Sequence, residues 1–169
     1  MEIRVLNESD AADFWSLRLE ALENDSAAFF ESADEFRALP IDTVVARLRT
    51  AGDDNFVMGA FDQGQLVGTA GFVREQRVKA QHKGRVWGMY VAPSARGKGV
   101  GRALLEALLA TARTLEGLEQ IELSVAQGQT AAKALYRSLG FEEWGYAPNA
   151  LHDRGTALAE HHMTLKLNR

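Results

Sequence analysis

The spacing of apolar residues predicts a strand and then a helix at the start of the chain. Residues 3–6 form a short, mostly apolar stretch of strand length, interrupted by Arg4. Ser9 and Asp10 are good helix N-caps, and side chains three or four positions apart follow them. A mixed, acidic stretch occupies residues 24–37, and a second helix, with a proline at its start, is predicted over residues 40–50. The residues at helical spacing in the first helix are Phe14, Leu17 or Arg18, Ala21 and Leu22.

Strand patterns dominate the middle of the chain. Residues 56–61 and 66–73 flank a short turn that contains Gly64, which predicts a hairpin. A further strand is predicted over residues 85–92, after which glycines turn the chain into a helix that ends before Gly117. The apolar face of this helix consists of Val100, Leu104, Ala107 or Leu108, and Leu115.

The last third of the chain returns to strand patterns. Residues 121–125 alternate between apolar and polar, residues 131–139 have helical spacing, and strands are predicted over residues 141–146 and 160–167. In the final strand, His161, Met163, Leu165 and Leu167 share one face. Because strands and helices mix without strict alternation, the pattern predicts a single α/β (α+β) domain over residues 1–169 with a mixed, mostly antiparallel sheet.

The turn after the 85–92 strand carries a candidate anion site. Glycines alternate at positions 97, 99 and 101, which leaves the backbone N–H groups of the turn and of the first helical turn uncovered. Arg96, Lys98 and Arg102 surround them with positive charge. Free donors and the helix dipole both favour an anion such as phosphate at this position. The alternative is a tight turn in which the glycines only relieve steric crowding.

Two common phosphate-binding patterns do not fit this turn. The nucleoside-triphosphate loop requires a hydroxyl residue directly after its lysine, but Lys98 is followed by glycine. The dinucleotide pattern G-x-G-x-x-G would need a glycine at position 102 or 104, where arginine and leucine stand. The pattern that fits is R-x-x-G-x-G, at Arg96, Gly99 and Gly101.

This motif resembles the pyrophosphate-binding motif of the GNAT acetyltransferase superfamily. Residues 87–93 resemble that family's central strand, and residues 129–141 resemble its second signature, with Gln129 where the family commonly has asparagine. The close resemblance covers about residues 87–146. It implies a sheet of about seven strands with helices on both faces. It also implies that the central strand diverges from its neighbour and that the pantetheine arm of acetyl-coenzyme A (acetyl-CoA) lies in the opening.

Acetyl-CoA is therefore the cosubstrate that the resemblance implies. The backbone around Met89 and Val91 is expected to pair with its pantetheine amides, and the turn from Arg96 to Arg102 is expected to hold its pyrophosphate. The residues assigned to the cosubstrate by position are Met89, Tyr90, Val91, Arg96, Gly97, Lys98, Gly99, Val100, Gly101, Arg102 and Gln129.

Two residues are candidate catalysts of acetyl transfer. Tyr136 stands where the family places its tyrosine and is expected to return a proton to the coenzyme A thiolate as it leaves. The alternative for Tyr136 is core packing, in an apolar stripe on its helix. Glu122 is the candidate general base, because it lies on a strand beside the predicted opening. Other carboxylates that qualify chemically are Glu31, Glu35, Glu75 and Glu160.

Composition narrows the mechanism and the class of partner. The chain has no cysteine, which excludes disulfides, thiolate zinc sites and an acyl-cysteine intermediate, so direct attack by the acceptor is expected. A formal net charge of -4 argues against nucleic acid as a partner. His161 and His162 point to opposite faces of a strand, which disfavours a metal site. No export signal is recognisable, and the longest apolar-rich stretch is too short to cross a bilayer, so a cytoplasmic protein without a membrane partner is expected.

Three functions fit these observations. The first is an acetyl-CoA-dependent N-acetyltransferase that acts on a primary amine, either a small molecule or a peptide. The second is a module that senses acyl-coenzyme A without turnover, and the third is a nucleotide-binding protein of another fold. The acidic residues 31–35 and the loop over residues 146–153 are expected to border the acceptor site. Dimers are common among proteins that resemble this one, so a homodimer is compatible with the sequence.

Overall fold

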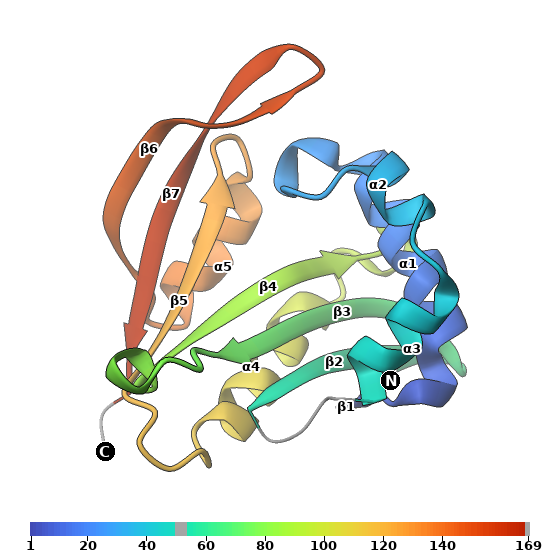
Figure 1. Ribbon diagram of the computed structural model, residues 1–169, viewed down its shortest axis with the longest axis horizontal. Coiled ribbons are helices and arrows are strands. Elements are labelled where there is room, and N and C mark those ends of the chain that lie inside the picture. The colour runs from blue at the N-terminus through green and yellow to red at the C-terminus, as the bar shows by residue number, and fades with distance from the viewer. Residues whose placement is uncertain (50–53, 168–169) are drawn as a thin grey trace.

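The computed structural model describes residues 1–49 and 54–167, and seven strands within them form one sheet (Figure 1). They are β1 (Glu2–Val5), β2 (Asn55–Asp62), β3 (Gln65–Arg74), β4 (Lys83–Val91), β5 (Gln120–Ala126), β6 (Glu142–Asp153) and β7 (Thr156–Lys166). The strand order is β1-β2-β3-β4-β5-β7-β6. Every neighbouring pair is antiparallel except β4 and β5, which run parallel. The predicted mixed, mostly antiparallel sheet is confirmed.

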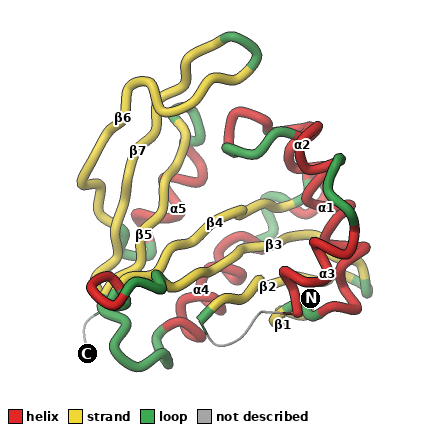
Figure 2. The backbone as a smooth tube through the Cα atoms, viewed as in Figure 1, coloured by secondary structure: helices red, strands yellow, loops and turns green. Residues whose placement is uncertain are grey.

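Helices cover both faces of the sheet, as the family resemblance implied (Figures 1 and 2). In the described part of the chain they are α1 (Ala11–Asn24), α2 (Ala33–Arg37), α3 (Ile41–Arg49), α4 (Val100–Ala112) and α5 (Thr130–Ser138). On one face, α4 and α5 enclose a core that includes Phe72, Ile121 and Met163. On the other face, α1, α2 and α3 pack around Phe14 and Phe36.

Helix α4 is fixed to the sheet by its apolar face. Leu104, Leu105 and Leu108 are fully buried, and burial of each such side chain contributes roughly 1.5–3 kcal/mol. The helix lies so close to β3 that a Cβ at Gly68 would be 2.9 Å from the Leu104 side chain. The N-terminus of α4 is therefore held firmly at the end of β4, where the glycine turn lies.

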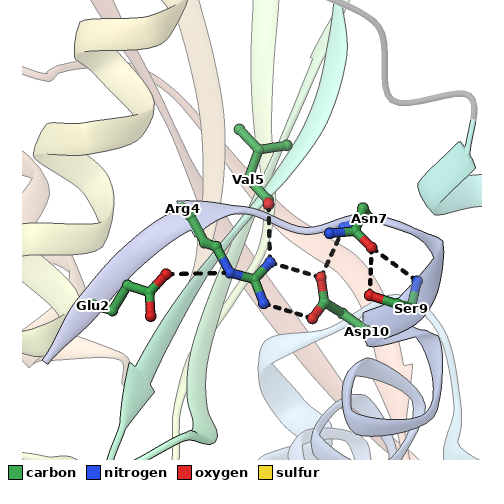
Figure 3. Close-up of polar contacts among 6 residues, drawn as sticks. All are labelled: Glu2, Arg4, Val5, Asn7, Ser9 and Asp10. Atoms are coloured by element: carbon green, nitrogen blue, oxygen red, sulfur yellow. Dashed lines mark hydrogen bonds and ion pairs between the residues drawn. The ribbon is translucent and has the colours of Figure 1, made fainter.

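Polar contacts join β1 to the start of α1 (Figure 3). Arg4 donates hydrogen bonds of 2.7 and 2.8 Å to the Asp10 carboxylate, which also accepts from the backbone N–H of Asn7. The Arg4 guanidinium is the main cause that holds the pKa of the buried Asp10 carboxyl below its usual value. Because α1 carries residues that border the site described below, this cluster helps to set where those residues lie.

The structure differs from the sequence-based predictions in three elements. Helix α2 lies in the mixed stretch 24–37, where the apolar pattern indicates no helix, and a capping box between Ser32 and Glu35 starts it. Helix α4 ends at Ala112, before Leu115, although Leu115 is still buried. Residues 146–153 form part of β6 rather than a loop. The predicted end of the second helix, at residue 50, lies outside the described residues.

Candidate active site

An opening lies where strands β4 and β5 diverge (Figure 1). The two strands are paired over only three residue pairs, of which the last is Arg85–Glu122. Beyond that point β4 stays paired with β3 as far as Val91, and β5 stays paired with β7 as far as Ala126. The backbone edges that face the opening therefore have no strand partner. This is the divergence that the family resemblance implied.

A bulge in β4 lies beside the opening. The register between β3 and β4 shifts opposite Gly88, which has a φ of +61°. The Trp87 ring lies against Gly71, where a Cβ would be only 2.2 Å from the indole. Trp87 packs with the core of the α1 face, whereas Met89 packs with the core of the α4 face. The bulge thus places different side chains on the two sides of the opening.

The glycine turn has the geometry of an anion site. Gly97 and Gly99 have φ of +75° and +77°, and a Cβ at either position would contact nothing within 4 Å. No side chain caps the N-terminus of α4. Among the described residues, no backbone carbonyl accepts from the amides of residues 97–102. A row of free donors at the positive end of a helix favours an anionic group.

Two of the three cations around this turn are held by other residues. Arg96 donates to the carbonyl oxygen of Val91 at 2.9 Å and pairs with Asp25 at 2.6 Å. Arg102 donates to the Ser138 hydroxyl at 2.6 Å. The Arg96 guanidinium is thus fixed at the end of β4, and its charge is shared with a carboxylate that sequence reasoning did not connect with the site.

A cavity of about 440 Å³ runs from the glycine turn into the opening. Its volume is in the range of small-molecule sites. Of the residues that the resemblance assigned to the cosubstrate, all line this cavity except Lys98. Sequence reasoning missed Asp25, Ala28 and Phe29, which approach from the segment after α1 and belong to no local motif. It also missed the α5 residues Ala131, Ala132 and Leu135, although these lie inside the second signature and could have been found there.

Tyr136 belongs both to the core and to the cavity wall. Its side chain is 7% exposed and packs edge-on against Phe141, with ring centroids 6.0 Å apart. Its hydroxyl donates to Met89 Sδ at 3.6 Å, at the edge of the opening. Burial raises the pKa of Tyr136 to about 12, so the phenol keeps its proton throughout the physiological pH range. The placement fits the packing role and the proton-donor role together.

Glu122 lies at the closed end of the opening and not along it. It forms the last residue pair of β4 and β5, and its carboxylate pairs with Lys83 at 3.2 Å and accepts from Gln120 at 2.8 Å. It does not line the cavity of about 440 Å³ or the smaller one described next. Glu122 thus lies on a strand that borders the opening, as expected, but at the point where the two strands separate and not along the opening itself.

A smaller cavity, of about 90 Å³, lies deeper between the diverging strands. Trp87, Gly88, Ser124 and Tyr136 are among its lining residues. The Ser124 hydroxyl and His162 Nδ1 are 2.9 Å apart, and His162 is only partly exposed. Strand alternation places His162 on the face opposite Met163, whose side chain is in the α4 core. A hydroxyl and an imidazole thus lie in contact on the α1 side of the opening.

The other carboxylates named from the sequence are placed less favourably. Glu31 pairs with Arg18, and Glu35 caps α2 through Ser32. Glu160 is 4% exposed, and burial raises the pKa of its carboxyl. Neither these three nor Glu75, the fourth, lines the cavities of about 440 and 90 Å³.

A third cavity, of about 380 Å³, lies between the segment after α1 and the β6–β7 hairpin. A hydrogen bond of 2.8 Å from the Ser26 hydroxyl to Asp153 joins these two regions. Residues from both of the segments expected to border the acceptor site line this cavity, including Glu31 and His152. Phe29 lines all three cavities and therefore lies where they approach one another. We call the α1 side of the opening, with this third cavity, the acceptor side.

In residues 1–49 and 54–167, no group of three or more histidine, cysteine or acidic side chains is arranged to hold a metal ion. Within the same residues, no helix is both long enough and apolar enough to span a membrane.

Known proteins share both the motifs and the fold. A 95-residue match with N-alpha-acetyltransferase RimI of Mycobacterium tuberculosis is 40% identical and covers 56% of this chain and 57% of the relative. An 89-residue match with mycothiol acetyltransferase of Salinispora tropica is 38% identical and covers 53% of this chain and 29% of the relative. The matched regions thus span less than two thirds of these curated relatives.

The solved structures extend this likeness to the whole fold. A phosphinothricin acetyltransferase of Sinorhizobium meliloti, solved in complex with acetyl-CoA, superposes with a TM-score of 0.85 at 25% identity, over 98% of this chain and 88% of that one. The family model of the Acetyltransferase (GNAT) family matches residues 17–141, which include the glycine turn and Tyr136. The chain therefore belongs to the GNAT family of acetyltransferases.

Proposed function

We propose that this protein is an N-acetyltransferase that moves the acetyl group of acetyl-CoA to a primary amine by direct attack. The observation that carries this proposal is the alignment of three features along one opening. Free amides at the start of α4 lie at one end of the cavity, the unpaired edge of β4 forms one side, and Tyr136 lines the part that adjoins the smaller cavity between β4 and β5.

The residues present fit acetyl-CoA. The amides of residues 97–102 suit its pyrophosphate, and the free edge of β4 around Met89 suits the amides of its pantetheine arm. The Val91 carbonyl already accepts from Arg96, which keeps that arginine beside the same strand edge. When bound, acetyl-CoA supplies an activated thioester, and the absence of cysteine from the chain supports a sequential mechanism without an acyl-cysteine.

Tyr136 is proposed as the general acid. Its hydroxyl lies at the junction of the two cavities that follow the strand edges, and its only hydrogen-bond partner in the described structure is a methionine sulfur, which is a weak acceptor. A neutral phenol in this position can donate to a thiolate as it forms and can deliver a proton to it.

The acceptor ammonium must lose a proton before it attacks. We propose that Ser124 and His162, on the acceptor side, accept this proton together. Glu122, the first candidate from the sequence, is occupied by Lys83 at the closed end of the opening. The structure favours His162, which can receive the proton through Ser124: the ammonium gives its proton to the Ser124 oxygen as that hydroxyl gives its own to Nδ1. The overall result is a neutral amine and a protonated imidazole.

Release of free thiol from acetyl-CoA, measured across a panel of primary amines, tests the function. The panel includes small amines, amino acids and peptides with free N-termini, because the names of the relatives cover both small molecules and protein N-termini. Amine-dependent thiol release supports the proposal. Tight binding of acetyl-CoA without any release points instead to a sensor of acyl-coenzyme A. Displacement by adenine nucleotides, but not by coenzyme A, points to a nucleotide-binding protein.

A further inference from the structure

Arg18 is a buried cation whose hydrogen-bonding capacity is not used up. It lies on α1, and its side chain is 8% exposed. Glu31 accepts from Nε at 3.4 Å and from Nη2 at 3.2 Å, which are long contacts for a charged pair. Nη1 is buried and has no hydrogen-bond partner in the described structure. Buried donors almost always have an acceptor, so a donor without one is a candidate ligand contact.

Arg18 Nη1 is directed at the bulge in β4. A Cβ built at Gly88 would lie 3.4 Å from Nη1, and the only atoms within 4 Å of that position, apart from the adjoining main chain, belong to Arg18. Gly88 itself lines the cavity of about 90 Å³. The space beside this glycine is therefore open on one side to the place where the amine must attack and is bounded on the other by a guanidinium.

Aromatic rings frame this position. The central carbon of the Arg18 guanidinium lies 4.6 Å from the centre of the Phe29 ring. Phe29 in turn lines both the cavity of about 440 Å³ and the third cavity. The second guanidinium on this face, that of Arg47, lies 6.0 Å from the centre of the Trp87 ring. The surroundings of Gly88 thus hold flat apolar surfaces and cations, with Glu31 as the carboxylate that pairs with Arg18.

An acceptor that fits must offer an anionic oxygen close to its reacting amine. A guanidinium next to the attacking nitrogen repels an ammonium. A hydrogen bond from it to a neutral amine would occupy the lone pair that must attack the thioester. The guanidinium matches a carboxylate, with which it can form two parallel hydrogen bonds. In an α-amino acid the carboxylate is separated from the amine by a single carbon. The amine can therefore reach the opening while the carboxylate lies beside Gly88.

We propose that Arg18 binds the carboxylate of the acceptor and that the acceptors of this protein are free α-amino acids. The proposal rests on the proposed acetyltransferase function and names its substrate class. The Phe29 ring must turn away from the guanidinium as the carboxylate enters, and the side chain of the amino acid then points toward the third cavity. Arg18 is in this role a specificity-determining residue, and it takes no part in the proton transfers.

Matched acceptors test the proposal on the unaltered protein. Each of several L-amino acids is compared with its amide and with the amine that lacks the carboxyl group, by kcat/KM from thiol release. We expect each amino acid to exceed both partners by about tenfold or more, because only the carboxylate leaves Arg18 satisfied. Peptides and simple amines that equal or exceed the amino acids would overturn the proposal, while the proposed function would stand. No release with any amine would overturn both.

Variants then locate the preference at Arg18. Arg18→Gln should lower kcat/KM for amino acids by roughly 10–100-fold, mainly through KM, and change that for the amides by less than about threefold. Arg18→Lys, which keeps the charge but not the fork of donors, should recover part of the loss. Arg113→Gln, at the exposed C-terminal end of α4, is the matched control. Acetyl-CoA affinity from calorimetry should stay the same in all three. Equal losses for amino acids and amides would show a structural role only.

Discussion

The two sides of the opening between β4 and β5 are built in different ways. The cosubstrate side is the cavity of about 440 Å³ that begins at the glycine turn. Most of its wall comes from two short stretches of chain, residues 89–102 and 129–136, and the first of them includes the free main-chain amides of residues 97–102. On the acceptor side, residues from four elements come together: Arg18 of α1, Gly88 of β4, Ser124 of β5 and His162 of β7. A long-range hydrogen bond from Ser26 to Asp153 joins the segment after α1 to β6. A site that binds its ligand through main-chain groups can be recognised in the local sequence, here by the alternating glycines. A site assembled from distant side chains has no such local pattern.

The largest expected effect is a loss of turnover when the Tyr136 hydroxyl is removed from the wall of the cosubstrate cavity. Tyr136→Phe keeps the ring that packs on Phe141 and removes the only proposed proton donor to the thiolate. We expect turnover to fall by about 10²–10⁴ while acetyl-CoA affinity stays within a few fold. Steady-state kinetics and calorimetry measure the two quantities. Wild-type turnover in this variant across the pH range would reduce Tyr136 to a packing residue.

Tyr136 should also make the free energy of unfolding depend on pH above pH 10. Because the folded-state pKa of Tyr136, about 12, is above the ordinary value of about 10, its contribution is complete below pH 10 and is lost as the pH rises toward 12. The full loss, reached above pH 12, is about 3 kcal/mol, roughly a hundredfold in the folding equilibrium, and most of it is reached by pH 11.5. Urea unfolding of the wild type and of Tyr136→Phe, compared from pH 8 to pH 11.5, isolates this contribution. A stability difference that does not change with pH would contradict it.

A smaller effect on kcat/KM distinguishes the two candidate general bases, His162 and Glu122. His162→Gln should lower kcat/KM by about 10–100-fold, because the amide cannot accept a proton. Glu122→Gln, at the closed end, should change the rate by less than about fivefold. Steady-state kinetics with a matched amine are the measurement. The opposite ranking would return the general base to Glu122.

The smallest of these effects concerns the phosphate end. Arg96→Ala should weaken acetyl-CoA binding by about tenfold and leave the KM of the amine nearly unchanged, because the backbone donors of the turn remain. Asp25→Asn, which releases Arg96 from its ion pair, should leave affinity equal or improve it by about threefold. Calorimetric titration of both variants decides this. Equal losses for cosubstrate and amine in Arg96→Ala would indicate a general loss of structure.

The order of strands and helices and the glycine turn could be predicted from local patterns, whereas the other residues assigned to the cosubstrate cavity came from the family resemblance. Strand β6 shows where local patterns failed. It is an edge strand with few buried residues and two register shifts, so its sequence lacks a regular alternation and contains Pro148. Helix α2 is too short for its apolar spacing to show, although Ser32 and Glu35 were a usable capping signal.

The acceptor side could be predicted only as two bordering segments. Nothing local to Ser124 indicates that His162 lies beside it, because their contact depends on the pairing of β5 with β7. The Arg18–Glu31 pair likewise requires the segment after α1 to fold back over that helix. Glu122 was chosen because its strand was expected to border the opening. The point at which two strands separate depends on how they pair, however, and cannot be read from either sequence alone.

In the proposed complex, the short ladder between β4 and β5 limits how far the pantetheine arm of acetyl-CoA can enter between the two strands. Neighbouring strands are about 4.8 Å apart, so an extended chain can lie between two strands only where they have separated to roughly twice that distance. Past Arg85 and Glu122 there is room, and before them there is none. One more residue pair in this ladder would keep the thioester further from Tyr136, and one pair fewer would let it pass this residue. The number of paired residues in the ladder, three, therefore determines the position of the reactive carbonyl carbon.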